Sequence, residues 1–197
     1  QRQMCIRDSI KSMRGSDPDA AVYYLARMLY AGESVTFIAR RMMICASEDV
    51  GNADPTALQV AVSASLAAER VGMPEAQIIL AQAAAYIACA PKSNAAVNAI
   101  ASAMKTVEET GNLAIPVHLQ DAHYKGAAKL GHGKDYKYAH DYPNHYVRQQ
   151  YLPYDTERRE FYQPGGMGYE VKIKEHMQRI RREAAKTEQK PQDGEEQ

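Results

Sequence analysis

Apolar residues recur at helical spacing through the first two thirds of the chain, and polar caps separate one run from the next. In the first run, Val22, Leu25 and Leu29 fall on one side of a helix. Asp17, which a proline follows, supplies the side-chain cap that helix starts prefer. The pattern therefore predicts a helix that begins near Asp17 and ends at Gly32, because glycine favours termination.

The same signals predict five more helices, which begin near Ser34, Asp54, Pro74, Ser93 and Pro116. The last of these helices fades near residue 130. The residues that we expect to face the core are Ile38, Met42 and Cys45 in the second helix, Leu58, Val62 and Leu66 in the third, Ile79, Ala83 and Ile87 in the fourth, and Val97, Ile100, Ala101 and Met104 in the fifth.

Short connections and frequent alanines define the expected architecture. Connections of only a few residues place neighbouring helices antiparallel. Alanine-rich helices allow the helix axes to approach closely. The sequence thus predicts an all-α protein with a compact antiparallel helical bundle over residues 10–130.

The composition changes after residue 130. Eight of the 13 tyrosines lie between residues 132 and 169, among several glycines and prolines. We expect residues 131–186 to form an irregular Tyr-rich segment followed by a C-terminal helix, packed on the same domain. Residues 187–197 are polar and are interpreted as a disordered tail.

The first nine residues do not fit the helical pattern that follows them. The chain begins with Gln1 rather than Met, and residues 3–9 resemble translated sequencing-adaptor read-through. We therefore expect residues 1–9 to be an artefact or a disordered tail, and the chain to be cut off upstream.

Charge and cysteine content narrow the classes of function. The 24 basic and 24 acidic side chains cancel, whereas a dedicated nucleic-acid-binding domain is usually basic. Contact with DNA would thus come from a local patch or from a part of the protein outside this chain. Three separated cysteines predict neither a disulfide framework nor a cysteine zinc site. This cysteine content favours a reducing compartment. No apolar run is long enough for a membrane span, so we expect the protein in the cytoplasm.

Motifs of catalysis and nucleotide binding are missing from the sequence. The phosphate-binding pattern GxxxxGK[ST] does not occur, and the glycine-rich residues 165–168 are interpreted as a turn. His118 and His123 are five residues apart, which puts them on different helix faces and disfavours a zinc site. We therefore predict no catalytic residue, cofactor or metal in this chain.

An arginine pair and a single lysine are candidates for contact with phosphate or with a partner. Arg40 and Arg41 could bind phosphate. The favoured interpretation is that they form ion pairs with acidic residues of another helix and so stabilise the fold. Lys92 stands at a helix start, where anions bind readily. Plain capping by Ser93 explains the same motif and is the favoured interpretation there.

A basic and aromatic stretch is the best candidate for a nucleic-acid surface. Basic groups meet phosphates, and tyrosine rings can stack on bases. Tyrosine and arginine are also enriched at subunit interfaces, which is the interpretation that we favour. The stretch comprises Lys125, Lys129, Lys134, Lys137 and Arg148, interleaved with Tyr136, Tyr138 and Tyr142.

Short motifs in order along the chain resemble one known family. Over residues 10–182 the chain is similar to the C-terminal region of the replication-associated recombination protein A family of AAA+ ATPases, whose eukaryotic relatives include the Werner-helicase-interacting ATPase. The motifs include Phe37-Ile-Ala-Arg-Arg-Met42, Ala46-Ser-Glu-Asp-Val-Gly51, Ala90-Pro-Lys-Ser-Asn94, Pro116-Val-His-Leu119 and Gln150-Tyr-Leu-Pro153.

The resemblance implies a parent protein related to clamp loaders and to the Holliday-junction motor RuvB. Such a protein binds ATP and Mg²⁺ in an ATPase core that this chain lacks. It acts on DNA at stalled replication forks, works with single-strand-binding protein and is associated with the bacterial nucleoid. Its C-terminal domain holds the subunits together, typically as a homotetramer.

Three functions are open on the sequence alone. The favoured hypothesis is an oligomerisation domain of a DNA-dependent AAA+ ATPase in replication, recombination and repair. The second is a stand-alone nucleic-acid-binding helical module that uses the segment from Lys125 to Arg148. The third is a small helical metalloenzyme that uses the histidines.

Overall fold

The chain divides into two compact units. The computed structural model describes residues 2–120, 133–156 and 158–188. The first unit comprises Gln1–Ala101 and Tyr162–Ile173, and the second comprises Ser102–Phe161 and Lys174–Gln197.

The described residues form seven α-helices and contain no strand, which confirms the all-α class. The helices are α1 (Arg2–Arg14), α2 (Pro18–Tyr30), α3 (Val35–Cys45), α4 (Thr56–Val71), α5 (Ala76–Cys89), α6 (Ala95–Thr110) and α7 (Tyr169–Glu188). A π-helical turn, η1 (Ala46–Val50), follows α3, and the short 3₁₀ turns are η2 (Gly51–Ala53), η3 (Val117–Leu119), η5 (Ala139–Asp141), η6 (Pro143–His145) and η7 (Tyr154–Thr156).

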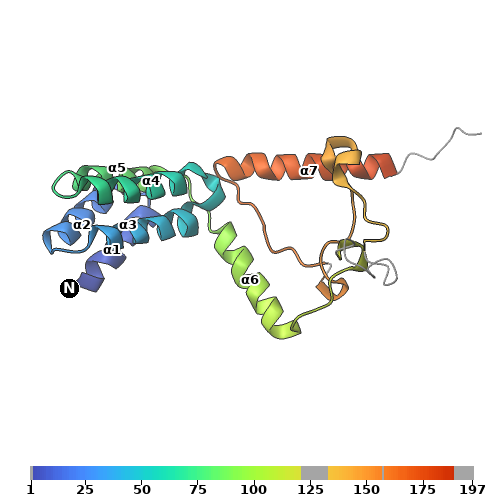
Figure 1. Ribbon diagram of the computed structural model, residues 1–197. Coiled ribbons are helices and arrows are strands. Elements are labelled where there is room, and N and C mark those ends of the chain that lie inside the picture. Colours follow the sequence, from blue (N-terminus) through green and yellow to red (C-terminus); the bar gives the residue numbers. More distant parts are fainter. Residues whose placement is uncertain (1, 121–132, 157, 189–197) are drawn as a thin grey trace, which may run out of the picture. The chain divides into compact units, whose positions relative to one another are not determined.

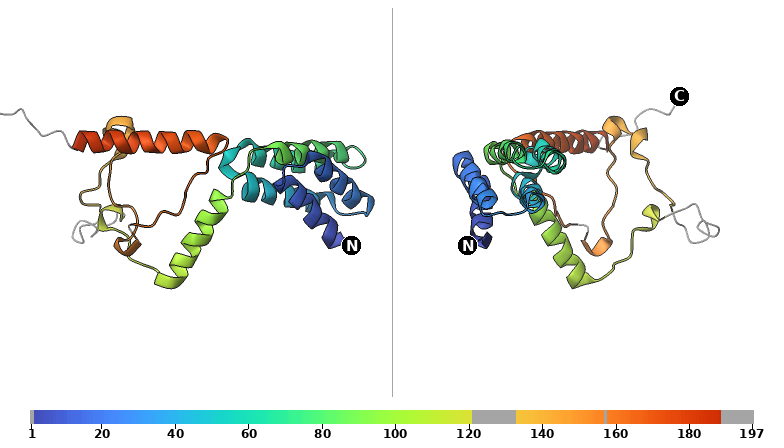
Figure 2. Two further views of the ribbon diagram at one scale, coloured as in Figure 1. Left: turned by 180° about the vertical axis from the view of Figure 1, so that it is seen from behind. Right: turned by 60° about the vertical axis from the view of Figure 1, so that its left-hand side comes forward.

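The core of the first unit lies among helices α1 to α5. In this bundle α1 packs on α2, α2 on α5, α5 on α4, and α4 on α3 (Figure 1). Figure 2 shows the same five helices grouped together from two further directions. The largest buried apolar side chains of the core are Met13, Leu25, Ile38, Met42, Leu80 and Ile87.

Two helix starts are capped as the sequence predicts. The side chain of Asp17 accepts a hydrogen bond of 2.9 Å from the backbone N–H of Ala20. The hydroxyl of Ser34 accepts one of 3.4 Å from the N–H of Phe37. Both bonds satisfy donors that the first turn of a helix leaves without a partner. The starts of α2 and α3 therefore follow from local sequence.

The predicted inward face of α4 points outward. Leu58, Val62 and Leu66 are 42%, 39% and 55% exposed. Small alanine side chains face inward instead and let α4 lie close to α3 and α5. Both stripes have helical spacing, so the hydrophobic pattern could not decide between them. The buried alanines of α4 are Ala57, Ala61, Ala64 and Ala68.

The predicted inward face of α6 is exposed as well. Ile100 is 61% exposed and Met104 is 53% exposed. Val97 and Ala101 are also exposed, whereas Ala95 at the start of the helix is buried. α6 therefore turns small residues inward and its larger apolar side chains outward.

Residues 2–9 belong to a helix in the structure rather than to a disordered tail, whereas their interpretation as an artefact stays a prediction. α1 begins at Arg2 and packs on α2. Ser9 and Ile10 are buried. The helix was missed because its buried apolar stripe is short, with Ile10 and Met13 as the members that the described side chains show.

The Tyr-rich segment is irregular, as predicted. Between residues 133 and 161 the described residues form only short 3₁₀ turns. Of the helix predicted from Pro116, the structure shows the single turn Val117–Leu119. Residues 121–132 lie outside the described residues.

The C-terminal helix is also present. α7 begins at Tyr169 and extends to Glu188, two residues beyond the predicted end of this region. The remainder of the predicted tail lies outside the described residues. The division into units places residues 162–173 with α1 to α5. That residues 131–186 belong to one domain with the bundle stays a prediction.

Candidate interaction surfaces

A buried carboxylate fastens the start of α7 to the first unit. Glu170 is fully buried. Its Oε2 accepts hydrogen bonds of 2.7 Å from the Ser93 hydroxyl and 2.6 Å from the Gly165 N–H. Its Oε1 accepts a bond of 3.0 Å from the Tyr162 hydroxyl. Three donors satisfy this carboxylate without a cation, and we call the arrangement the Glu170 clasp.

Tyr162 extends the Glu170 clasp to the turn η2. Asn52 Nδ2 donates a hydrogen bond of 3.0 Å to the Tyr162 hydroxyl oxygen. Partial burial raises the pKa of the Tyr162 hydroxyl, and its bond to Glu170 acts in the same direction. The hydroxyl therefore stays protonated and keeps its role as a donor to Glu170.

The glycine-rich residues 165–168 form a turn, as the sequence predicts. Gly168 has a φ of 58°, and a Cβ at this position would overlap the carbonyl oxygen of Ala53 and approach the ring of Pro91. The glycine thus permits close packing between this turn and the bundle. Gly165 supplies one of the three donors to Glu170.

The acidic pair after α3 is held by Arg14. Arg14 Nε donates to Asp49 Oδ1 at 2.5 Å, and its Nη2 lies 3.2 Å from Glu48 Oε1. Asp49 is buried and lies in the π-helical turn η1. No sequence signal pointed to Arg14, because it is 35 residues from Asp49.

Cys45 belongs to the same network. Its Sγ donates a hydrogen bond of 3.3 Å to Asp49 Oδ2. Burial, together with the charge of Asp49, raises the pKa of the Cys45 thiol to about 12. Cys45 is therefore an inert core thiol, in agreement with its interpretation as a small core residue.

Arg40 and Arg41 do not form the predicted ion pairs within the described part of the chain, where Arg14 takes the acidic partners. Arg40 is exposed. Arg41 is half-buried, and its Nε is buried without a hydrogen-bond partner. Contact of either residue with phosphate or with another subunit stays a prediction.

Lys92 points at the end of α5 rather than at an anion site. Its Nζ donates to the carbonyl oxygens of Ile87, Ala88 and Ala90 at 3.0, 2.9 and 2.5 Å. These bonds satisfy carbonyls that the last helical turn leaves open. Burial lowers the pKa of the Lys92 ammonium.

The favoured capping role at this helix start agrees with the structure. The Ser93 hydroxyl oxygen accepts a bond of 3.2 Å from the N–H of Ala95. Because Lys92 is engaged by the three carbonyls, a role for it in contact with DNA or with another subunit stays a prediction.

An apolar groove runs between α2 and α5 in the first unit. Its volume is about 600 Å³. Leu25 forms part of its floor, and Tyr30 and Ile78 at its rim are largely exposed. The groove also contains Val22 and Leu29, which the sequence places on one face of the first predicted helix. That face is thus only partly covered.

The basic and aromatic stretch lies on the second unit where it is described. Lys125 and Lys129 are outside the described residues. The remaining candidates are exposed and available to a partner. They are Lys134, Lys137 and Arg148 among the basic residues, and Tyr136, Tyr138 and Tyr142 among the tyrosines.

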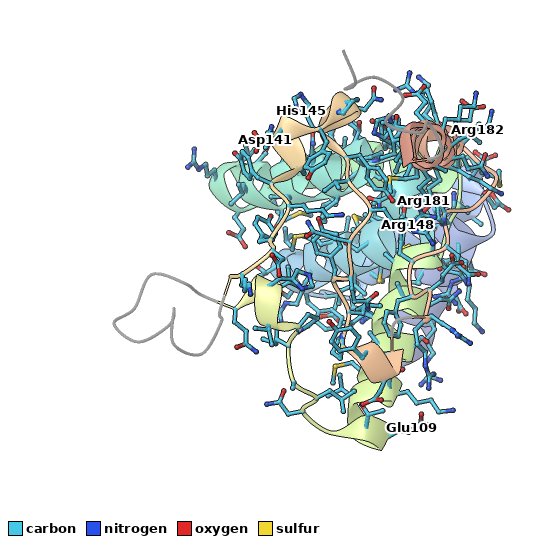
Figure 3. All side chains as sticks on the ribbon, turned by 90° about the vertical axis from the view of Figure 1, so that its right-hand side faces the viewer. Glu109, Asp141, His145, Arg148, Arg181 and Arg182 are labelled. Carbon is cyan, nitrogen blue, oxygen red and sulfur yellow. The ribbon has the colours of Figure 1, made fainter. Side chains whose placement is uncertain are left out.

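Three of these candidates meet at one pocket. The pocket has a volume of about 210 Å³ and lies between residues 137–148 and α7. Lys137, Tyr142 and Arg148 line it. Figure 3 labels Arg148 and Arg181 beneath α7 in an end-on view of that helix. The other lining residues are Pro143, Asn144, Tyr146, Val147, Glu183, Ala184 and Thr187.

Three of the described histidines contact a backbone carbonyl or a neighbouring ring. His118 Nε2 lies 2.6 Å from the carbonyl oxygen of Gln150. The ring of His140 lies between those of Tyr138 and His145, with centroids 5.1 and 4.8 Å away. Among the described residues, no three His, Cys, Asp or Glu side chains are grouped as metal ligands would be. His123 and His132 are outside the described residues.

The described helices were compared with the length and apolar character that a membrane span requires. Within the described ranges, each helix is either too short or too polar to cross a bilayer.

Proteins similar to this chain are found in bacteria and in a eukaryote. An uncharacterised AAA domain-containing protein of Mycobacterium tuberculosis is 52% identical over 172 residues, which are 87% of this chain and 38% of that protein. Replication-associated recombination protein A of Escherichia coli K12 is 45% identical over 168 residues, which are 85% of this chain and 38% of that protein. ATPase WRNIP1 of Dictyostelium discoideum is 39% identical over 154 residues, which are 78% of this chain and 18% of that protein. This chain thus spans less than two fifths of the length of these relatives.

A family comparison gives the same result over most of the fold. Residues 15–181 match the family described as MgsA AAA+ ATPase C terminal. The match begins just after α1 and extends into α7, so it includes the Glu170 clasp and the pocket residues up to Arg148. The chain belongs to this family of C-terminal regions of AAA+ ATPases.

Proposed function

We propose that this chain is the C-terminal assembly domain of an AAA+ ATPase that acts on DNA in replication, recombination and repair at stalled forks. Family membership supports the class of the parent protein. ATP and Mg²⁺ would be bound by the remainder of that protein. The family resemblance implies DNA and single-strand-binding protein as its partners and a homotetramer as its assembled form.

The observation that carries the assembly role is the apolar surface left open on ordered helices of the first unit. Leu66 belongs to an exposed stripe on α4, and Ile78, which is 68% exposed, borders the groove between α2 and α5. Single exposed apolar residues are normal on protein surfaces, whereas contiguous ones mark interaction sites. A partner helix that covers these residues would remove apolar area from water and stabilise the complex.

α6 carries a spacing suited to contact between helices. Val97, Ile100, Met104 and Val107 are separated by three, four and three residues, and all four are exposed. This alternation is the pattern by which helices of a coiled coil interdigitate. The α6 stripe, as we call these four residues, is therefore a candidate contact with a second copy of the chain.

The proposed mechanism is geometric. A domain that joins copies fixes the number and spacing of the ATPase modules attached to it. Joining also raises the local concentration of those modules, so that weak contacts between them form more readily. The described surfaces need no catalytic group for this role.

The test is the mass of the purified chain in solution, measured by light scattering across a range of concentrations. A stable tetramer supports the proposal, whereas a monomer at every concentration contradicts it. Leu66→Glu on the exposed stripe of α4 is expected to lower the mass if that stripe is buried between copies. Ser63→Glu is the matched control, since Ser63 is exposed on the same helix outside the stripe.

A second candidate function is nucleic-acid binding by the second unit. The observation that favours it is the meeting of Lys137, Tyr142 and Arg148 at one pocket. Basic side chains that contact phosphates and aromatic rings that stack on bases form the usual surface for single strands. This candidate and the assembly role are compatible, because they use different residues.

A further inference from the structure

The pocket on the second unit has a rigid frame. Val147 and Ile180 are both buried and anchor residues 142–148 and α7 respectively within this unit. Asn144 Nδ2 donates a hydrogen bond of 2.6 Å to Glu183 Oε2, which ties the two walls together. The pocket is therefore held open between two connected elements.

The mouth of the pocket is fixed as well. The Gln149 side chain accepts a bond of 3.2 Å from the Lys137 N–H and donates one of 2.8 Å to the Lys137 carbonyl oxygen. This pair of bonds holds the Lys137 backbone beside the segment that carries Arg148. Two cationic side chains, those of Lys137 and Arg148, thus line the same pocket.

The backbone beside the pocket adopts an uncommon conformation. Asn144 has a φ of 57° and His145 has a φ of 50°, so two consecutive non-glycine residues lie in the left-handed region. Such residues are uncommon and cost energy, and they cluster where a ligand must be held. Here they direct Asn144 towards Glu183.

The size and chemistry of the pocket limit its ligand. A volume of about 210 Å³ is below the range of roughly 300–1,000 Å³ that holds drug-sized molecules, so a single planar ring system fits better than a whole nucleotide. Tyr142 and Tyr146 supply aromatic walls. Glu183 and the amide oxygen of Asn144 are acceptors, whereas Lys137 and Arg148 are cations that line the same pocket.

We propose that this pocket receives one base of a single-stranded nucleic acid, with the neighbouring phosphates on Lys137 and Arg148. The base stacks on a tyrosine ring, and its exocyclic amino group donates to the Glu183 carboxylate. The proposal deepens the second candidate function and does not depend on the assembly role. It predicts a preference for bases that carry an amino group, such as cytosine, over thymine, which lacks one.

The test is fluorescence anisotropy of the full chain with labelled single strands of roughly 12 nucleotides, a length within the usual range of sites. Oligo(dC) is expected to bind more tightly than oligo(dT), and Glu183→Gln is expected to reduce this preference. Tyr142→Leu should weaken the binding of oligo(dC) by roughly 5- to 150-fold, the range expected for one stacked base. Tyr154→Leu is the matched control, because Tyr154 is exposed in the same unit outside the pocket.

The phosphate contacts have their own readout. Arg148→Ala should lower the slope of log affinity against log salt by about 0.7, the value for one phosphate contact on a single strand. Arg158→Ala, an exposed arginine of the same unit outside this pocket, should leave the slope unchanged if the contacts lie at the pocket mouth.

An abasic strand of the same length separates base insertion from attraction to the backbone. Much weaker binding of that strand supports the proposal. Equal binding of the abasic strand would overturn the pocket while leaving a nucleic-acid surface intact, and no binding of any strand would overturn both. Because the chain contains no tryptophan, tyrosine emission gives a second readout. Oligo(dC) should quench it and the abasic strand should not, in the unaltered protein.

Discussion

The Ser93 hydroxyl donates a hydrogen bond of 2.7 Å to Glu170, which lies 77 residues further along the chain. Ser93 lies two residues before α6, and the bond joins it to the first turn of α7. Ser93 also accepts a bond from the N–H of Ala95. One hydroxyl thus caps one helix and fastens another. This contact and the other donors to Glu170 lie within the first unit, which includes residues 162–173.

The Glu170 clasp is expected to contribute measurably to stability. Ser93→Ala should lower the free energy of unfolding by about 1.5–3 kcal/mol, the range for a hydrogen bond to a charged group. Urea denaturation measures this change. Glu170→Gln should show non-additivity with Ser93→Ala in a double-mutant cycle, with a coupling of about 0.5–3 kcal/mol. Ser63→Ala, at an exposed position, serves as control, and strict additivity of the pair would contradict the clasp.

Gly168 and Gly166 give a matched pair of substitutions. Gly168→Ala should destabilise the fold by about 1–3 kcal/mol or more, because the added Cβ meets the Ala53 carbonyl and the backbone has a positive φ. Gly166→Ala should have little effect, since nothing lies within 4 Å of its Cβ position. Thermal unfolding of the two variants checks the difference. Equal losses would mean that the turn does not pack against Ala53 as described.

Cys45 and Cys89 should differ in reactivity. The thiolate is the reactive form of cysteine, and the pKa of Cys45 is raised to about 12. In a Cys5→Ser background at pH 8, iodoacetamide should modify the exposed Cys89 and leave Cys45 unmodified until the protein unfolds. Mass spectrometry of the digested protein measures both sites. Rapid modification of Cys45 in the folded protein would contradict its burial.

The same pKa predicts how stability depends on alkaline pH. In the unfolded chain the Cys45 thiol ionises near its ordinary pKa of 9.0, whereas in the folded chain it stays protonated up to about 12. The unfolded state therefore binds fewer protons in this range, and stability falls as the pH rises from 9 towards 12. Cys45→Ala should remove this part of the pH dependence, as measured by urea denaturation at several pH values.

The α6 stripe is expected to contribute to association. Ile100→Glu should reduce the mass of the assembled chain, because a charge would be buried against apolar side chains of another copy. Asn98→Glu places the same charge on an exposed position of the same helix outside the stripe. Light scattering of both variants distinguishes a specific contact from a general effect of charge. A full assembly formed by Ile100→Glu would exclude the stripe from the interface.

The helices could be predicted from the sequence because their signals are local. Asp17 and Ser34 cap helix starts from within the same few residues, and the periodic apolar positions show that a helix exists. Which face of a helix turns inward depends on its neighbours. In α4 the alanines and the larger residues have the same spacing, so Leu66 was predicted inside and lies outside.

The candidate site was predictable only in part, for the same physical reason. The basic and aromatic stretch is continuous in sequence, so Lys137, Tyr142 and Arg148 could be selected together. Their pocket also needs Glu183 from α7, which no local pattern connects to them. Arg14 with Asp49 and Ser93 with Glu170 are likewise contacts between distant residues, and they were missed.

The buried alanines of α4 limit how much this helix can add to the free energy of unfolding of the first unit. Each buried alanine removes only one methyl group from water, which is worth about 0.8 kcal/mol, whereas a fully buried leucine is worth about 1.5–3 kcal/mol. The leucines that could add to this sum, Leu58 and Leu66, gain it only when another surface covers them. Since binding to the folded state stabilises it by mass action, folding and association become one linked equilibrium. The melting temperature should then rise with protein concentration, and dilution alone should weaken the fold.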